Sequence, residues 1–140
     1  MIAAVDASVV VKWFFPEPEK EPHVDRALRL LEGIRNGEVE PLQPAHWLAE
    51  VVAVIARLSP HIAPRAVDLL HALEFDEADE PAIYKTAAAL ASNLGEHLFD
   101  TLYHAVALEH DGLLVTADQR YFSRAKRLGH IVDLAEWTAK

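Results

Sequence analysis

Short apolar runs separated by helix-length segments constrain the fold of this chain more than any other feature. Residues 2–5, 39–42, 113–116 and 131–133 form such runs, and 113–116 (Leu-Leu-Val-Thr) has the unbroken apolar character of strands buried on both faces. Strands joined through helices imply right-handed crossovers and a mostly parallel sheet. We therefore expect an α/β fold, a three-layer sandwich with a mostly parallel central sheet flanked by helices.

Periodicity and capping residues predict where the helices lie. The Asp6-Ala7-Ser8 segment offers N-cap chemistry for a short helix at 9–15, and three prolines make 16–22 a stiff loop. Further helices are expected at 23–33, 45–58, 64–73, 80–93 and 98–110, and one more begins at Asp118. Because the stretch 45–110 is long for simple β–α alternation, we also expect a helical protrusion or layer on one side.

Length and composition limit the class of protein. A chain of 140 residues is expected to fold as one domain, 1–140, and without cysteine it has neither a disulfide framework, a cysteine-ligated metal nor a cysteine nucleophile. No apolar stretch approaches the ~18 residues of a membrane span, and the N-terminus lacks the basic region of a signal peptide. These features predict a cytoplasmic protein of bacterial type that does not bind membranes.

The charge is unevenly distributed. A net charge of −9 argues against a broadly basic surface that grips nucleic acid, and five acids with no base fall within 74–80. Residues 119–130, in contrast, contain four bases and no acid: Arg120, Arg124, Lys126 and Arg127. This basic stretch is either a solvated helix with cations near its C-terminus or a local phosphate-binding flank.

Two aspartates follow predicted strands. In open parallel sheets, binding sites form beyond the carboxyl ends of the strands. Asp6 directly follows the first strand, and Asp118 lies two residues after the strand that ends at Thr116. Each could simply cap the following helix, which is the commonest role of an aspartate at such a place.

Two further acids lie on predicted helices. Glu50 borders the apolar face of helix 45–58 near Val54, where it can be solvated or can reach over the end of the sheet. Asp100 stands in the first turn of helix 98–110, where an acid favours the helix dipole or pairs with His104. The helical periodicity alone does not choose between these roles.

At these positions the sequence resembles the PIN-domain ribonucleases, and particularly their VapC-type toxin members. The matching blocks occur in family order over nearly the whole chain: Val5-Asp6-Ala7-Ser8, Pro44-Ala45-His46-Trp47-Leu48-Ala49-Glu50-Val51, Phe99-Asp100-Thr101-Leu102-Tyr103 and Thr116-Ala117-Asp118. The resemblance implies a PIN-like fold with its acidic site at Asp6, Glu50, Asp100 and Asp118, accompanied by Ser8 and Thr116. Some members carry a further acid soon after the last block, where this chain has Gln119 and Arg120.

The chemistry that the resemblance implies is metal-dependent hydrolysis of RNA phosphodiester bonds. Clustered carboxylates repel one another unless a cation compensates them, and Mg²⁺ or Mn²⁺ suits hard oxygen ligands. Asp6, Asp100 and Asp118 would be ligands, and Glu50 would be a ligand or would position the attacking water. Ser8 and Thr116 would orient these carboxylates through hydrogen bonds. The resemblance also implies an antitoxin partner of the VapB type and allows a homodimer.

Three alternatives stay open from the sequence. A phosphoacceptor aspartate, as in receiver domains or phosphatases, would need a second acid where Ala7 and Ser8 stand. A zinc site on one helical stripe could involve His97, Asp100 and His104, although no H-E-x-x-H motif is present. An inactive PIN-fold interaction domain is the third, because helix 9–15 is apolar almost all round and Trp13 and Phe14 could receive a partner helix.

Overall fold

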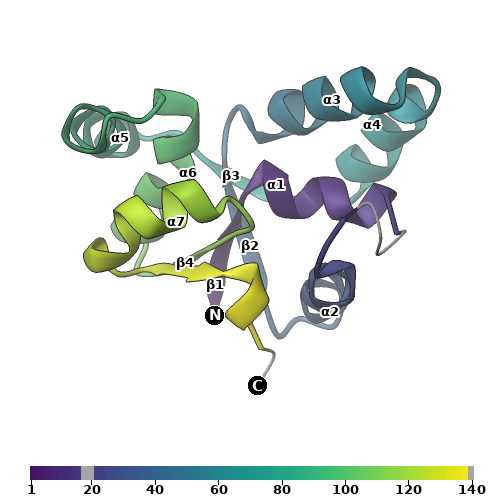
Figure 1. Cartoon of the computed structure of the whole chain (residues 1–140), viewed down its shortest axis with the longest axis horizontal. Helices are drawn as coiled ribbons and strands as arrows, with labels where there is room; N and C mark the ends of the chain where they lie inside the picture. The colour runs from purple at the N-terminus through teal and green to yellow at the C-terminus, as the bar shows by residue number, and fades with distance from the viewer. Residues whose placement is uncertain (17–20, 139–140) are drawn as a thin grey trace.

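The computed structural model describes residues 1–16 and 21–138, and its centre is a five-stranded sheet (Figure 1). The strands are β1 (Ile2–Val5), β2 (Glu40–Pro44), β3 (Asp76–Ala78), β4 (Leu113–Thr116) and β5 (Ile131–Asp133). All neighbouring pairs are parallel, in the order β3-β2-β1-β4-β5. The predicted α/β class is confirmed, and the sheet is parallel throughout.

Helices cover both faces of this sheet. The α-helices are α1 (Ala7–Val10), α2 (Val24–Arg35), α3 (Trp47–Leu58), α4 (Ala63–Ala72), α5 (Pro81–Leu94), α6 (Leu98–Glu109) and α7 (Gln119–Ala125). α6 packs on β1, β2 and β4, whereas α1 continues into the 3₁₀ helix η1 (Val11–Phe14), which packs against α2. α3 and α4 pack together beyond α1, at the upper right of Figure 1, and form the predicted helical protrusion.

The structure differs from the sequence-based expectation at one strand and one helix. The acidic segment 74–80, for which the sequence analysis predicts no strand, contains β3, which pairs with β2 in the register Leu42↔Asp76 and Pro44↔Ala78. An edge strand of three residues needs only one buried side chain, here Ala78, so it shows no apolar alternation. The expected helix 9–15 is α1 followed by η1, and residues 17–20 of the predicted loop lie outside the described residues.

The first helix contributes its apolar residues to the core rather than to a free surface. Val9, Val10 and Val11 are at most 4% exposed. Trp13 is partly buried, and its indole Nε1 donates a hydrogen bond to the Ala27 carbonyl of α2 at 2.8 Å. The expectation of spare apolar surface on this helix is therefore wrong for the three valines, because α1 lies between β4 and α3.

A buried glutamine fixes the carboxyl end of β1. The β1–β2 ladder pairs Ile2 with Glu40 and Ala3 with Pro41. Beyond these pairs, the side chain of Gln43 forms the hydrogen bonds to β1. Its Oε1 accepts from the Val5 amide at 2.7 Å, and its Nε2 donates to the Val5 carbonyl at 2.9 Å. The two bonds satisfy backbone groups that would otherwise be buried without partners, directly before Asp6.

Within the described residues, no helix is long and apolar enough to cross a membrane.

Candidate active site

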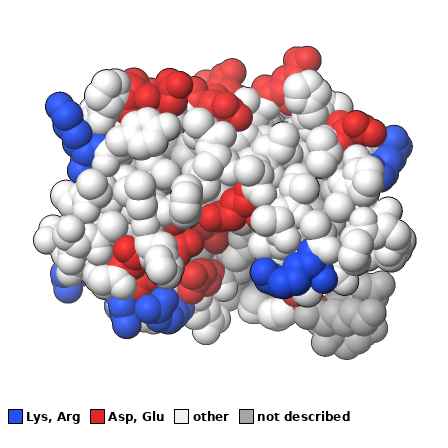
Figure 2. All heavy atoms as spheres, turned by 90° about the horizontal axis from the view of Figure 1, so that it is seen from above, with Lys and Arg blue, Asp and Glu red and all other residues white. Residues whose placement is uncertain are grey.

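An open cleft of about 530 Å³ lies at the carboxyl ends of the central strands. The connections run from β1 to β2 and β3 in one direction and to β4 and β5 in the other, so the topological switch point lies between β1 and β4. Figure 2 looks down on this end of the sheet and shows acidic side chains gathered in a hollow across the middle of the face. All four predicted acids line it: Asp6, Glu50, Asp100 and Asp118.

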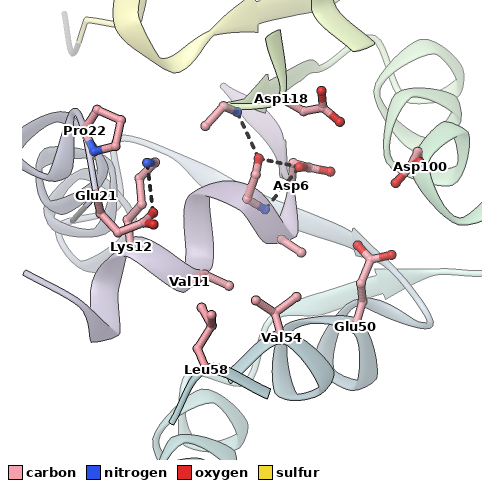
Figure 3. A pocket seen from close by; sticks show the side chains of 13 residues that line it. Asp6, Val11, Lys12, Glu21, Pro22, Glu50, Val54, Leu58, Asp100 and Asp118 are labelled. Atoms are coloured by element: carbon pink, nitrogen blue, oxygen red, sulfur yellow. Dashed lines mark hydrogen bonds and ion pairs between the residues drawn. The ribbon is translucent and has the colours of Figure 1, made fainter. Parts of the chain in front are cut away.

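Asp6 is held at the end of β1 by its neighbours. Its amide donates to the Val115 carbonyl of β4 at 3.0 Å, and its carboxylate caps α1 by accepting from the Ser8 amide at 3.1 Å. The Ser8 hydroxyl donates to the same oxygen, Oδ2, and the Thr116 hydroxyl approaches it at 3.4 Å. The Ser8 and Thr116 hydroxyls therefore both lie against the Asp6 carboxylate, the arrangement that the family resemblance implies. Figure 3 shows this carboxylate in the middle of the cleft.

Asp118 is positioned by the end of β4 and the start of α7. Its Oδ1 caps α7 by accepting from the Tyr121 amide at 3.0 Å, and its own amide donates to the Thr116 hydroxyl at 3.1 Å. The Ser8 hydroxyl accepts from the Ala117 amide at 3.0 Å, which ties this loop to α1. Asp118 thus caps α7 and also lines the cleft. Its role as a helix cap therefore does not exclude a role in the acidic site.

Glu50 and Asp100 reach the cleft from the first turns of α3 and α6. The Glu50 Oε2 lies 3.6 Å from the Nε2 of His46, one turn earlier in the chain, and this imidazole nitrogen is 2.9 Å from the Phe99 carbonyl. Glu50 and Asp100 face each other across one side of the cleft in Figure 3. The carboxylate from α3 therefore points over the end of the sheet, which the sequence pattern left open.

The clustered carboxylates change one another's acidity. Burial raises the pKa of Asp6 from 3.8 to about 6, and the charges of Glu50 and Asp100 add to the rise against the opposing hydrogen bonds from Ser8. Burial also raises the pKa of Asp100, with contributions from Glu50 and Asp118. The negative charges of these acids therefore repel one another across the cleft. A cation bound between them would relieve this repulsion.

The donor set fits a hard divalent cation, because the oxygens belong to carboxylates that line one cleft and repel one another. Among residues 1–16 and 21–138, no three potential ligand side chains stand close enough together to share one ion as they are placed here. Ser8 and Thr116 already supply the hydrogen bonds that orient a ligating carboxylate.

Two of the four bases in the predicted basic stretch, Arg120 and Arg124, form ion pairs with a buried acid. Glu96, whose side chain is 1% exposed, accepts from Arg120 at 3.1 Å and from Arg124 at 2.7 Å. All four basic side chains are exposed, but the guanidinium groups of Arg120 and Arg124 also anchor α7 to the loop before α6. The sequence did not predict these ion pairs, because Glu96 is 24 residues from Arg120 and 28 residues from Arg124.

The zinc alternative is wrong for His104. This side chain is fully buried, with its ring nitrogens 3.0 Å from the Tyr121 hydroxyl and 2.8 Å from the Gly129 carbonyl. Burial lowers its pKa, as for a neutral core histidine. His104 therefore has no nitrogen left for a metal shared with His97 and Asp100.

Sequence reasoning missed one residue that lines the cleft and one that is buried close to its acids. Lys12 interrupts the apolar helix, yet it is buried and lines the cleft. The Tyr103 hydroxyl is buried without a hydrogen-bond partner of good geometry among the described groups, and burial together with the charges of Glu50 and Asp6 raises its pKa. The sequence pattern indicates only that Tyr103 is a core residue. Its hydroxyl comes close to Glu50 and Asp6 through tertiary packing, which a sequence pattern does not show.

A model of the PIN domain matches residues 3–128 of the chain. The chain belongs to the PIN domain family. PIN domains are generally nucleases and generally use divalent metals, which agrees with an acidic cleft built from segments far apart in the sequence. Among curated proteins, no sequence match was found.

Three solved structures resemble this PIN domain in fold. A toxin-antitoxin complex from Klebsiella pneumoniae aligns with a TM-score of 0.67 at 18% identity, over 94% of this chain and 97% of that chain. VapBC-1 from nontypeable Haemophilus influenzae aligns with a TM-score of 0.67 at 19% identity, over 97% and 100%. FitAcB from Neisseria gonorrhoeae aligns with a TM-score of 0.61 at 21% identity, over 98% and 100%. These likenesses establish the shared fold.

Proposed function

We propose that this PIN domain is an endoribonuclease that hydrolyses RNA phosphodiester bonds with Mg²⁺ or Mn²⁺ and acts in the cytoplasm as a VapC-type toxin. The observation that carries the proposal is the convergence of four acids from separate segments, Asp6, Glu50, Asp100 and Asp118, on the cleft at the switch point of the sheet. The PIN family match and the toxin–antitoxin structures of the same fold support it.

Each acid has a role in this proposal. Asp6, Asp100 and Asp118 would hold the cation directly or through water, and Glu50 would be a further ligand or would position the attacking water. When bound, the cation supplies charge stabilisation to the phosphoryl oxygens and lowers the pKa of a water molecule. Ser8 and Thr116 keep the Asp6 carboxylate turned toward the cleft through their hydroxyl groups.

The proposed regulator is an antitoxin of the VapB type. The related solved structures include toxin–antitoxin complexes, and an acidic cleft attracts an Arg or Lys side chain, which could occupy the place of the cation. Inhibition through such a basic segment should weaken as salt concentration rises. The partly exposed Trp13 and Phe14 stay candidates for contact with the partner, and a homodimer stays a prediction that light scattering can test.

A cleavage assay tests the proposal. The purified protein is incubated with structured and unstructured RNAs, with either Mg²⁺ or Mn²⁺, and Asp6→Asn is the matched inactive control. We expect cleavage with added metal, none with excess EDTA and none with the variant. Full activity in EDTA would refute the metal requirement, and equal activity of the variant would show that a contaminating nuclease or another site is responsible.

A further inference from the structure

Lys12 is an unusual residue for the floor of an acidic cleft. It lies in η1, is 4% exposed, and lines the same cleft as the four acids. Lysine is almost never buried in proteins unless its ammonium group has a partner. Here that partner is Glu21, whose Oε1 lies 3.1 Å from the Lys12 Nζ.

The ion pair lies at the opposite end of the cleft from Glu50 and Asp100. Figure 3 shows Lys12 and Glu21 on one side, with the apolar side chains of Val11, Val54 and Leu58 between them and the α3 and α6 carboxylates. Lys12 follows Asp6 by six positions along α1 and η1, which corresponds to an axial rise of about 10 Å between the two backbones. Among the described groups, the Lys12 ammonium is paired with Glu21 and with none of the four acids.

The charge of the cleft makes Lys12 important for an anionic substrate. Among the described residues that line the cleft, Lys12 is the one with a basic side chain, against the four acids and Glu21. Arg120 and Arg124 do not line it, and both are paired with Glu96. A nucleic-acid strand that lies along the cleft would cross this surface, where its phosphates need a cation.

We propose that Lys12 binds a backbone phosphate of the RNA next to the one held at the acids, and that Glu21 occupies this phosphate position in the free protein. The proposal rests on the proposed nuclease function and adds a substrate-positioning residue to it. Lys12 acts on binding and on the path of the strand, because Figure 3 shows it at the other side of the cleft from Glu50 and Asp100.

An exchange of partners is physically reasonable at this place. A buried ammonium group that loses its partner is strongly destabilising, but here one anionic oxygen replaces another and the charge of Lys12 stays paired. The Glu21 side chain is 28% exposed, so its carboxylate can return to water when the phosphate arrives. A charge-assisted hydrogen bond from the ammonium to a phosphate oxygen then fixes the strand.

The test measures binding of a fluorescein-labelled, mixed-sequence single-stranded RNA to protein that carries Asp118→Asn, so that the probe stays intact. Lys12→Met keeps the buried stem and removes the charge, and Lys85→Met removes the same charge from an exposed position on α5. We expect Lys12→Met to weaken binding about tenfold or more, the effect of one lost hydrogen bond to a charged group. The slope of log affinity against log salt should fall by about 0.7, the value for one phosphate contact on a single strand.

Glu21→Gln separates substrate binding from a purely structural ion pair. If Glu21 occupies the phosphate position, this variant binds the RNA as tightly as its parent or more tightly, although it has lost the same ion pair as Lys12→Met. Thermal melting of both variants shows that they are folded. Unchanged affinity and salt slope in Lys12→Met, or equal losses in both variants, would overturn the inference. If the parent protein binds no RNA in the same assay, the proposed function itself fails instead.

Discussion

Replacing Asp6 by Asn removes a charge that the folded, metal-free protein holds at an energetic cost. The pKa of Asp6 is raised from 3.8 to about 6, so the folded state disfavours the ionised form. A difference of this size corresponds to about 3 kcal/mol above pH 6. Asn keeps the N-cap, because its amide oxygen can accept from the Ser8 amide as Asp6 does.

The raised pKa of Asp6 determines how the stability difference between the wild type and Asp6→Asn changes with pH. Between pH 4 and pH 6 the folded protein binds a proton at Asp6 that the unfolded chain has lost, so the wild type loses stability as pH rises through this window. The variant has no such proton. Its advantage is therefore about 1 kcal/mol at pH 4.5 and about 3 kcal/mol at pH 8, and the latter corresponds to roughly 5–10 °C in Tm.

Urea denaturation in EDTA at both pH values, followed by tryptophan fluorescence, measures the difference. Asp68→Asn, at an exposed position on α4, is the matched control and should change little at either pH. Added Mg²⁺ should stabilise the wild type but not Asp6→Asn, so that the difference shrinks. A variant that is less stable at pH 8, or a gain that is equal at both pH values, would refute the reasoning.

Three further substitutions test other parts of the structure. Asp118→Asn should abolish cleavage yet leave the Tm of the metal-free protein nearly unchanged or higher, because Asn caps α7 about as well as Asp; a large fall in Tm would contradict this. Gln43→Leu should destabilise the protein by roughly 2–5 kcal/mol in urea denaturation, because both Val5 backbone groups lose their partners; a neutral effect would refute that role. Trp13→Ala should cost about 3 kcal/mol by the same measurement, whereas Leu69→Ala, exposed on α4, should cost little; a stable Trp13 variant that loses the antitoxin would instead make Trp13 a docking residue.

The elements with strong local patterns could be predicted closely. β1, β4 and β5 have the bounds that their apolar runs indicated, and α5 and α6 begin and end within one residue of the predicted ranges. The acid after β1 and the acid after β4 were placed correctly at the cleft, because the carboxyl ends of neighbouring parallel strands meet at one edge of the sheet. β3 was missed because Asp76 and Glu77 are exposed on an edge strand, which leaves no apolar signature.

Local chemistry thus determined which segments form strands and helices and where two of the four acids stand. Hydrophobic periodicity and capping act over a few residues, so both can be read directly from the sequence. Only tertiary structure decided that Glu50 points into the cleft, that Lys12 is buried beside Glu21, and that Glu96 anchors α7. Each of these depends on which distant side chains surround the residue in the fold, and a buried charge is kept only where such partners compensate its loss of water.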